Sequence, residues 1–147
     1  MIKINNKHQN VTLPQTVENI ARWHNERNLI DGTTSYKQTE KLLEEFTELV
    51  SAQLARDTGL KPSAKYVYDE TRSMLDRLFE AGRIKGIEPE HAEDELQDAV
   101  GDMLVVQTNI AEREGFTIAD AAFNAYLEIK DRKGKMLNGT FVKEADL

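Results

Sequence analysis

The sequence predicts an all-α protein, a compact bundle of about five helices followed by a short C-terminal arm or hairpin. Apolar residues recur at intervals of three and four along most of the chain, and no segment reads clearly as a strand. The composition agrees, because 39% hydrophobic and 31% charged residues are typical of a globular domain. A chain of 147 residues has the usual size of one domain, so we expect residues 1–147 to share one core.

The first two helices are predicted from their start signals and their apolar spacing. A proline at the start of residues 14–27 suits a first helical turn. After a turn at residues 31–34, Ser35 and Gln38 have the spacing of a capping box. The second helix then runs to about Asp57 along an apolar stripe. This stripe consists of Leu42, Leu43, Phe46, Leu49, Val50 and Leu54.

Three further helices follow. The third is expected to open at residues 61–63 and to stop at Gly82 or Gly86. The fourth extends over residues 88–115, and the fifth starts at Thr117 and continues to about Lys133.

Residues 135–143 differ from the rest of the chain. Their Asn138-Gly139 pair is flanked by apolar residues, which is the signature of a short hairpin. Because an isolated hairpin is marginally stable in water, a flexible or partner-bound arm is the alternative.

Charge and composition exclude several classes of protein. The net charge of -7 disfavours uniform binding to the phosphate backbone of nucleic acid. The sequence contains no cysteine, which excludes disulfides, thiolate catalysis and cysteine zinc sites. Met1–Lys7 lacks the apolar stretch of a signal peptide, and no run approaches the ~20 apolar residues of a membrane span. We therefore expect a cytoplasmic protein that binds neither nucleic acid nor a membrane.

The second predicted helix contains the run Glu44-Glu45-Phe46-Thr47-Glu48. At 3.6 residues per turn, Glu45 and Glu48 share a face beside the apolar stripe, whereas Glu44 points more nearly away. Like charges at this spacing repel unless something lies between them. Because exposed glutamate is common in helices, a lone motif of this kind is most often a solvated acidic face.

The fourth predicted helix favours a functional site. Its apolar residues occupy nearly every direction, so we expect much of it to be buried. One narrow stripe is nevertheless polar, and it contains Glu95, Asp98, Asp102 and Asn109. Asp102 lies against the apolar run 103–106, and aspartate is rarely buried unless it is paired or bound to metal. Acidic residues in a first turn interact favourably with the helix dipole, but that interaction does not explain Asp102, which lies two turns further along.

Two acidic stripes that face each other would form an all-oxygen site, which suits Mg²⁺. Zinc is disfavoured because His8, His24 and His91 are scattered along the chain. A di-iron bundle needs Glu-x-x-His on two helices, and only residues 88–91 have that spacing.

The two motifs together resemble those of a known family. The Glu-Glu-x-x-Glu run at residues 44–48 and the Asp-x-x-Gly-Asp run at residues 98–102 are similar to those of the MazG-like, all-α NTP pyrophosphatases. These enzymes include dimeric dUTPases and phosphoribosyl-ATP pyrophosphohydrolases, and the likeness extends from about Trp23 to the C-terminus. The resemblance implies Mg²⁺ as cofactor, with Mn²⁺ as a substitute, and hydrolysis of the α–β phosphate linkage by a metal-activated water.

The resemblance also assigns roles to single residues. Glu45 and Glu48 match the metal ligands of the first motif, and Glu44 matches its leading acid, a water-orienting base. The groups that resemble base- and phosphate-contacting residues are Lys37, Gln38, Asn124, Lys130, Arg132, Lys133 and Lys135. The cations among residues 130–135 would also favour the dipole at the end of a helix, whatever they bind.

The second motif departs from the family pattern. Asp98 and Asp102 are the preferred metal ligands, and Glu95 is the alternative partner of Asp98. Ala99 stands where the family usually has glutamate. The long third helix between the two motifs is a further departure, since an inserted helix can reshape the substrate pocket.

The sequence thus predicts an enzyme that hydrolyses a nucleoside triphosphate or deoxynucleoside triphosphate to monophosphate and pyrophosphate. We expect a homodimer or homotetramer, because amphipathic helices of this family normally complete the site by association. The alternatives are a narrow-specificity enzyme similar to dUTPase or phosphoribosyl-ATP pyrophosphohydrolase, and a non-catalytic helical module that senses metal or nucleotide.

Overall fold

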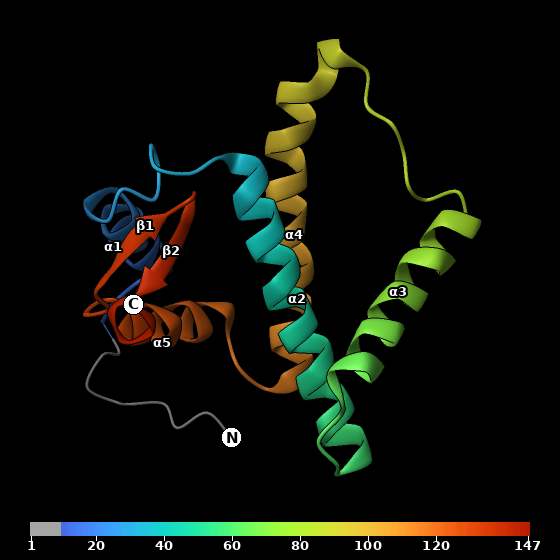
Figure 1. Ribbon diagram of the computed structural model, residues 1–147. Coiled ribbons are helices and arrows are strands. Elements are labelled where there is room, and N and C mark those ends of the chain that lie inside the picture. Colours follow the sequence, from blue (N-terminus) through green and yellow to red (C-terminus); the bar gives the residue numbers. More distant parts are fainter. Residues whose placement is uncertain (1–9) are drawn as a thin grey trace. The chain divides into compact units, whose positions relative to one another are not determined.

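The computed structural model describes residues 10–147 (Figure 1), so Met1–Lys7 and His8 lie outside the described residues. Its elements are α1 (Leu13–Glu26), α2 (Ser35–Thr58), α3 (Ala64–Glu80), α4 (Ala92–Glu114), α5 (Ile118–Ile129), β1 (Gly134–Leu137) and β2 (Thr140–Lys143). Two short 3-10 helices, η2 (Pro89–His91) and η3 (Glu144–Asp146), complete them. The prediction of five helices with a C-terminal hairpin is confirmed. None of the helices in the described part is long and apolar enough to cross a membrane.

The chain divides by its internal contacts into two units. One unit is residues 35–88, which hold α2 and α3. The other joins the described residues up to Thr34 with residues 89–147, and it contains α1, α4, α5 and the hairpin. The expectation of one core for residues 1–147 stays a prediction.

In the larger unit, α1 packs on α5 and the hairpin around Trp23. The Trp23 ring lies 5.7 Å from the Phe141 ring, and the Arg27 guanidinium lies 4.7 Å from the Trp23 centroid. Arg27 also donates from Nε to the Arg132 carbonyl at 2.9 Å and from a terminal nitrogen to the Lys130 carbonyl at 3.1 Å. α5 ends at Ile129, short of the predicted Lys133, and the two carbonyls that accept from Arg27 lie just beyond this end.

Capping side chains explain where several helices begin. Thr12 and Gln15 form a capping box at the start of α1. The Ser63 hydroxyl accepts from the Tyr66 amide at the start of α3, and Thr117 plays the same part for α5. The capping box expected from Ser35 is wrong, because Ser35 is already the first residue of α2.

The hairpin pairs β1 with β2 in antiparallel register, with Leu137 opposite Thr140. Asn138 and Gly139 both have positive φ, at 51° and 78°. A two-residue turn of this kind matches the twist of the strands, which is why Asn-Gly is favoured there. The hairpin, rather than a free arm, is therefore the correct alternative.

α4 departs from its prediction. The helix was expected to be largely buried, yet Ala111 is the only buried residue along Ala92–Glu114. Six large apolar side chains of α4 are exposed: Leu96, Val100, Met103, Leu104, Val105 and Val106. The apolar pattern around α4 therefore marks surface that its own unit leaves exposed.

Candidate metal centre

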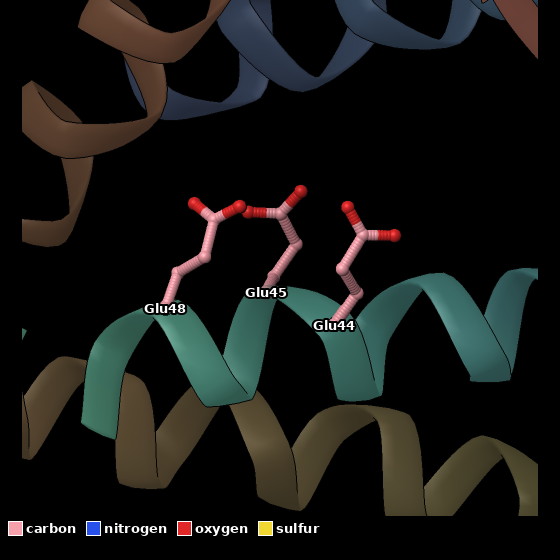
Figure 2. A group of neighbouring side chains, drawn as sticks. All are labelled: Glu44, Glu45 and Glu48. Atoms are coloured by element: carbon pink, nitrogen blue, oxygen red, sulfur yellow. The ribbon is translucent and has the colours of Figure 1, made fainter. Parts of the chain in front are cut away.

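The carboxylates of Glu44, Glu45 and Glu48 gather on one side of α2. One oxygen from each lies within 4.8 Å of the others, and all three residues are exposed. Figure 2 shows the three side chains projecting from the same side, with the carboxylates of Glu45 and Glu48 turned toward one another. Among the described residues they are the only group of three acidic or histidine ligands this close together.

The position of Glu44 differs from the expectation that it points away. Glu44 and Glu48 are four residues apart, and Glu45 and Glu48 are three apart, so each pair meets on neighbouring turns. The two methylenes of each glutamate let the carboxylates converge from different angles. Glu44 therefore belongs to the cluster formed by Glu45 and Glu48.

Lys41 supplies the counter-charge of this cluster. Its Nζ donates to a Glu44 oxygen at 2.7 Å and to a Glu45 oxygen at 2.9 Å. Burial works against the charged form of Lys41, but hydrogen bonds and charge attraction from Glu44 and Glu45 outweigh it and raise the pKa of Lys41. The sequence analysis missed this residue, although its spacing of three and four residues from Glu44 and Glu45 was the signal.

The acidic residues of α4 are arranged differently. Glu95, Asp98 and Asp102 are all exposed, and they form no such close group among themselves. Glu95 and Asp102 are seven positions apart, which is about 10.5 Å along a helix axis. One ion on α4 would therefore need ligands from another element. The choice between Asp98–Asp102 and Glu95–Asp98 as the ligand pair stays open.

Asp102 does not lie in an apolar setting, which corrects the sequence argument. Its side chain is exposed, because the apolar run 103–106 beside it is exposed as well. Within the described residues no ion pair involves Asp102, so a buried structural pair with a cation is not its role. Burial is thus no longer an argument for metal at this position, and only its place on the acidic stripe supports one.

The candidate substrate residues lie in both units. Lys37 and the exposed Gln38 are on α2, and Lys37 pairs with Glu40 at 3.0 Å. The half-buried Asn124 is on α5. The remaining candidates follow α5 or lie on β1, and they are Lys130, Arg132, Lys133 and Lys135.

The four cations are partly engaged in structure. Lys130 Nζ lies 3.0 Å from Asp131, and the carbonyls of Lys130 and Arg132 accept hydrogen bonds from Arg27. The Lys133 carbonyl accepts from the amide of Glu144. Most of these contacts involve backbone atoms. Lys133 and Lys135 are exposed.

Glu48 also faces a hollow within residues 35–88. A cleft of about 710 Å³ separates α2 from α3, and Glu48 lines it together with residues of both helices. A second hollow of about 550 Å³ lies between α2 and residues 59–62, and Glu48 lines that one too. The acidic cluster therefore borders space that a molecule larger than an ion can enter.

The donor atoms of the cluster would suit a hard cation. Its ligand atoms are carboxylate oxygens, which Mg²⁺ prefers over nitrogen and sulfur donors. Small rotations bring oxygens within 4.8 Å to the ~3–4 Å that separates two ligands of one Mg²⁺ ion. Comparison with protein-family models, with curated proteins and with solved structures found no match to this chain.

Proposed function

We propose that this protein is a Mg²⁺-dependent nucleoside triphosphate pyrophosphohydrolase of the MazG-like, all-α kind. It converts a ribo- or deoxyribonucleoside triphosphate to the monophosphate and pyrophosphate in the cytoplasm. The observation that carries the proposal is the convergence of Glu44, Glu45 and Glu48 on one exposed side of α2. Their motif supports the family assignment, and their accessibility supports a site that a metal–nucleotide complex can reach.

The three glutamates have different parts in this proposal. Glu45 and Glu48 would hold the ion, and the resemblance implies Asp98 and Asp102 as further ligands. Bound Mg²⁺ neutralises phosphate charge and lowers the pKa of a coordinated water. Glu44 accepts a proton from the water that attacks the α-phosphorus. The bond from that phosphorus to the α–β bridging oxygen breaks, and pyrophosphate leaves with both electrons of that bond.

Product analysis tests this activity. Purified protein is incubated with each ribo- and deoxyribonucleoside triphosphate and Mg²⁺, and the products are separated by ion exchange. We expect monophosphate and pyrophosphate, loss of activity in EDTA, and recovery with Mg²⁺ or Mn²⁺. Orthophosphate with nucleoside diphosphate would refute the mechanism. Turnover of a single nucleotide would identify the narrow-specificity alternative, and binding without turnover would identify the sensing module.

Self-association forms part of the proposal. α4 contacts α5 and η2 within its unit, yet it leaves apolar side chains exposed around most of the helix. A second copy of the same chain offers the same apolar surface, and burying the two against each other removes both from water.

The mass of the protein in solution tests this association. Light scattering at a few micromolar should give at least twice the 16.7 kDa of one chain. Val106→Glu places a charge on an exposed valine of α4 (59% exposed) and should shift the mass toward 16.7 kDa. Gln107→Glu adds the same charge at a polar position and should leave the mass unchanged. A wild-type mass of one chain would reject association.

A further inference from the structure

The cleft between α2 and α3 lies wholly within residues 35–88. Its apolar lining includes Leu43, Val67 and Leu75, and the buried Thr71 lines it as well. Figure 1 shows the two helices diverging from the loop that joins them. A volume of about 710 Å³ falls within the ~300–1,000 Å³ range of small-molecule sites.

The cleft is also lined by side chains of both charges. Arg72 and Asp76 line it one turn apart on α3, and Glu48 lines it from α2. Two carboxylates against one guanidinium disfavour a polyanion there but offer donors and acceptors to a neutral polar molecule. The charge of this cleft therefore suits the uncharged part of a nucleotide, not its phosphates.

Tyr68 adds an aromatic surface to the same cleft. It is 56% exposed, and Lys65 Nζ lies 5.3 Å from the centroid of its ring. The face of the ring opposite Lys65 is suited to stack on a flat heterocycle. Base stacking on an aromatic side chain tolerates any base, whereas Arg72 and Asp76 can distinguish the edges of bases.

Glu48 connects the cleft to the acidic cluster. Its carboxylate is one of the three grouped on α2, and the same residue lines the cleft. We infer that the α2–α3 cleft binds the nucleoside part of a triphosphate whose phosphates lie at Glu44, Glu45 and Glu48. This inference rests on the proposed function, and it makes α3 the element that determines substrate specificity.

Two tyrosines of α3 provide a matched test. Tyr68 lines the cleft, and Tyr66 does not, although it is comparably exposed at 43%. Calorimetry with Mg²⁺ compares two probes: non-hydrolysable α,β-imido deoxynucleoside triphosphates and inorganic tripolyphosphate. Tyr68→Ala should weaken nucleotide binding about tenfold and leave tripolyphosphate binding unchanged, because only the nucleotide carries a base. Tyr66→Ala should change neither.

A cleft-filling variant gives an independent readout. Leu75→Trp should weaken the affinity for nucleotide about tenfold or more, because the indole occupies the space of the base. Tripolyphosphate should still bind. Leu78→Trp is the control, since Leu78 is on the same helix but does not line the cleft.

The outcomes separate the cleft from the activity. Pyrophosphate release by the wild type together with unchanged nucleotide binding in both Tyr68→Ala and Leu75→Trp would overturn the cleft assignment and leave the proposed function standing. Equal loss of nucleotide and tripolyphosphate binding would also overturn it. A change of oligomeric mass in Leu75→Trp without loss of nucleotide binding would assign the cleft to a second copy of the chain instead. A wild type that neither binds nor hydrolyses nucleotide would reject both proposals.

Discussion

The two acidic helices of this chain, α2 and α4, differ in how their carboxylates are arranged. On α2, Glu44 and Glu48 are four residues apart, about 6 Å along the axis, and Glu45 lies between them. On α4, Glu95 and Asp102 are about 10.5 Å apart along the axis. The long side chains of α2 converge within 4.8 Å, whereas the acids of α4 form no such group.

The difference shows which of the two helices forms a close carboxylate cluster from its own residues. A helix supplies a local cluster only when its ligands fall within about one turn and have side chains long enough to meet. α2 meets both conditions and also carries a counter-ion, Lys41. The acids of α4 form no close cluster by themselves. Substitutions on the two helices should therefore differ in size and in kind.

Removing the two proposed metal ligands of α2 should have the largest effect. The double variant Glu45→Gln/Glu48→Gln should lower pyrophosphate release at least ~1000-fold, because losing two anionic ligands costs several kcal/mol of charge stabilisation. Circular dichroism should show an unchanged helical fold, since both residues are exposed. The control is Glu40→Gln on the same helix, outside the cluster. Substantial activity in the double variant would remove the cluster from the catalytic site.

Asp102→Asn on α4 should have the next largest effect. As one contributing ligand, it should reduce hydrolysis roughly 100-fold and shrink the stabilisation by Mg²⁺, which reaches ~2.7 kcal/mol at a hundredfold excess over the dissociation constant. The unfolding free energy of the metal-free protein should change by less than ~0.5 kcal/mol, because Asp102 is exposed.

The control for Asp102 is Asp94→Asn, in the first turn of the same helix. It should retain full activity. Its unfolding free energy should fall only by the ~0.3–1 kcal/mol that an acid contributes near a helix N-terminus. A stable and fully active Asp102→Asn protein would show that α4 does not contribute a ligand at this position.

Glu44→Gln should separate proton transfer from metal binding within the α2 cluster. We expect a rate loss of about 10- to 100-fold, near the lower limit for a general base, because bulk water can replace an exposed base. Stabilisation by Mg²⁺, measured as a shift of the thermal midpoint, should stay close to that of the wild type. A variant that loses both the rate and the Mg²⁺ shift would make Glu44 a ligand.

Lys41→Gln should have the smallest effect of these substitutions, and it should strengthen Mg²⁺ binding where the others weaken it or leave it unchanged. Without the ammonium group, Mg²⁺ should bind severalfold more tightly, because no internal cation competes for Glu44 and Glu45. The metal-free protein should lose less than ~1 kcal/mol, as is usual for exposed ion pairs. Lys65→Gln, which breaks the pair with Asp69 on α3, is the control and should leave the Mg²⁺ affinity unchanged.

The pH dependence of the Lys41 contribution follows from the direction of its pKa shift. The pKa of Lys41 in the folded protein is raised above its ordinary value of 10.5. Its stabilising contribution is therefore complete below the ordinary value and is lost as the pH rises through the higher folded value. Wild type and Lys41→Gln should differ in stability at neutral pH and become alike in strong alkali. A difference that persists unchanged in strong alkali would contradict this assignment.

The sequence by itself determined the local structure and one half of the candidate site. Apolar periodicity and cap residues such as Ser63 and Thr117 located the helices to within a few residues, and Asn138-Gly139 identified the hairpin, because these features depend on near neighbours in the chain. The Glu45–Glu48 pair was predicted for the same reason, since residues three apart on a helix always lie close together.

Tertiary structure decided what depends on distant residues. Arg27 donates to carbonyls just beyond α5 that are more than 100 residues away in the sequence, a contact that no local pattern encodes. The exposure of Asp102 also could not be predicted from its apolar neighbours. The apolar pattern of a helix shows which side chains favour burial, but not whether another element packs on them. The cleft between α2 and α3 also could not be predicted from local sequence, because residues of both helices, Tyr68 and Leu75 among them, form its lining.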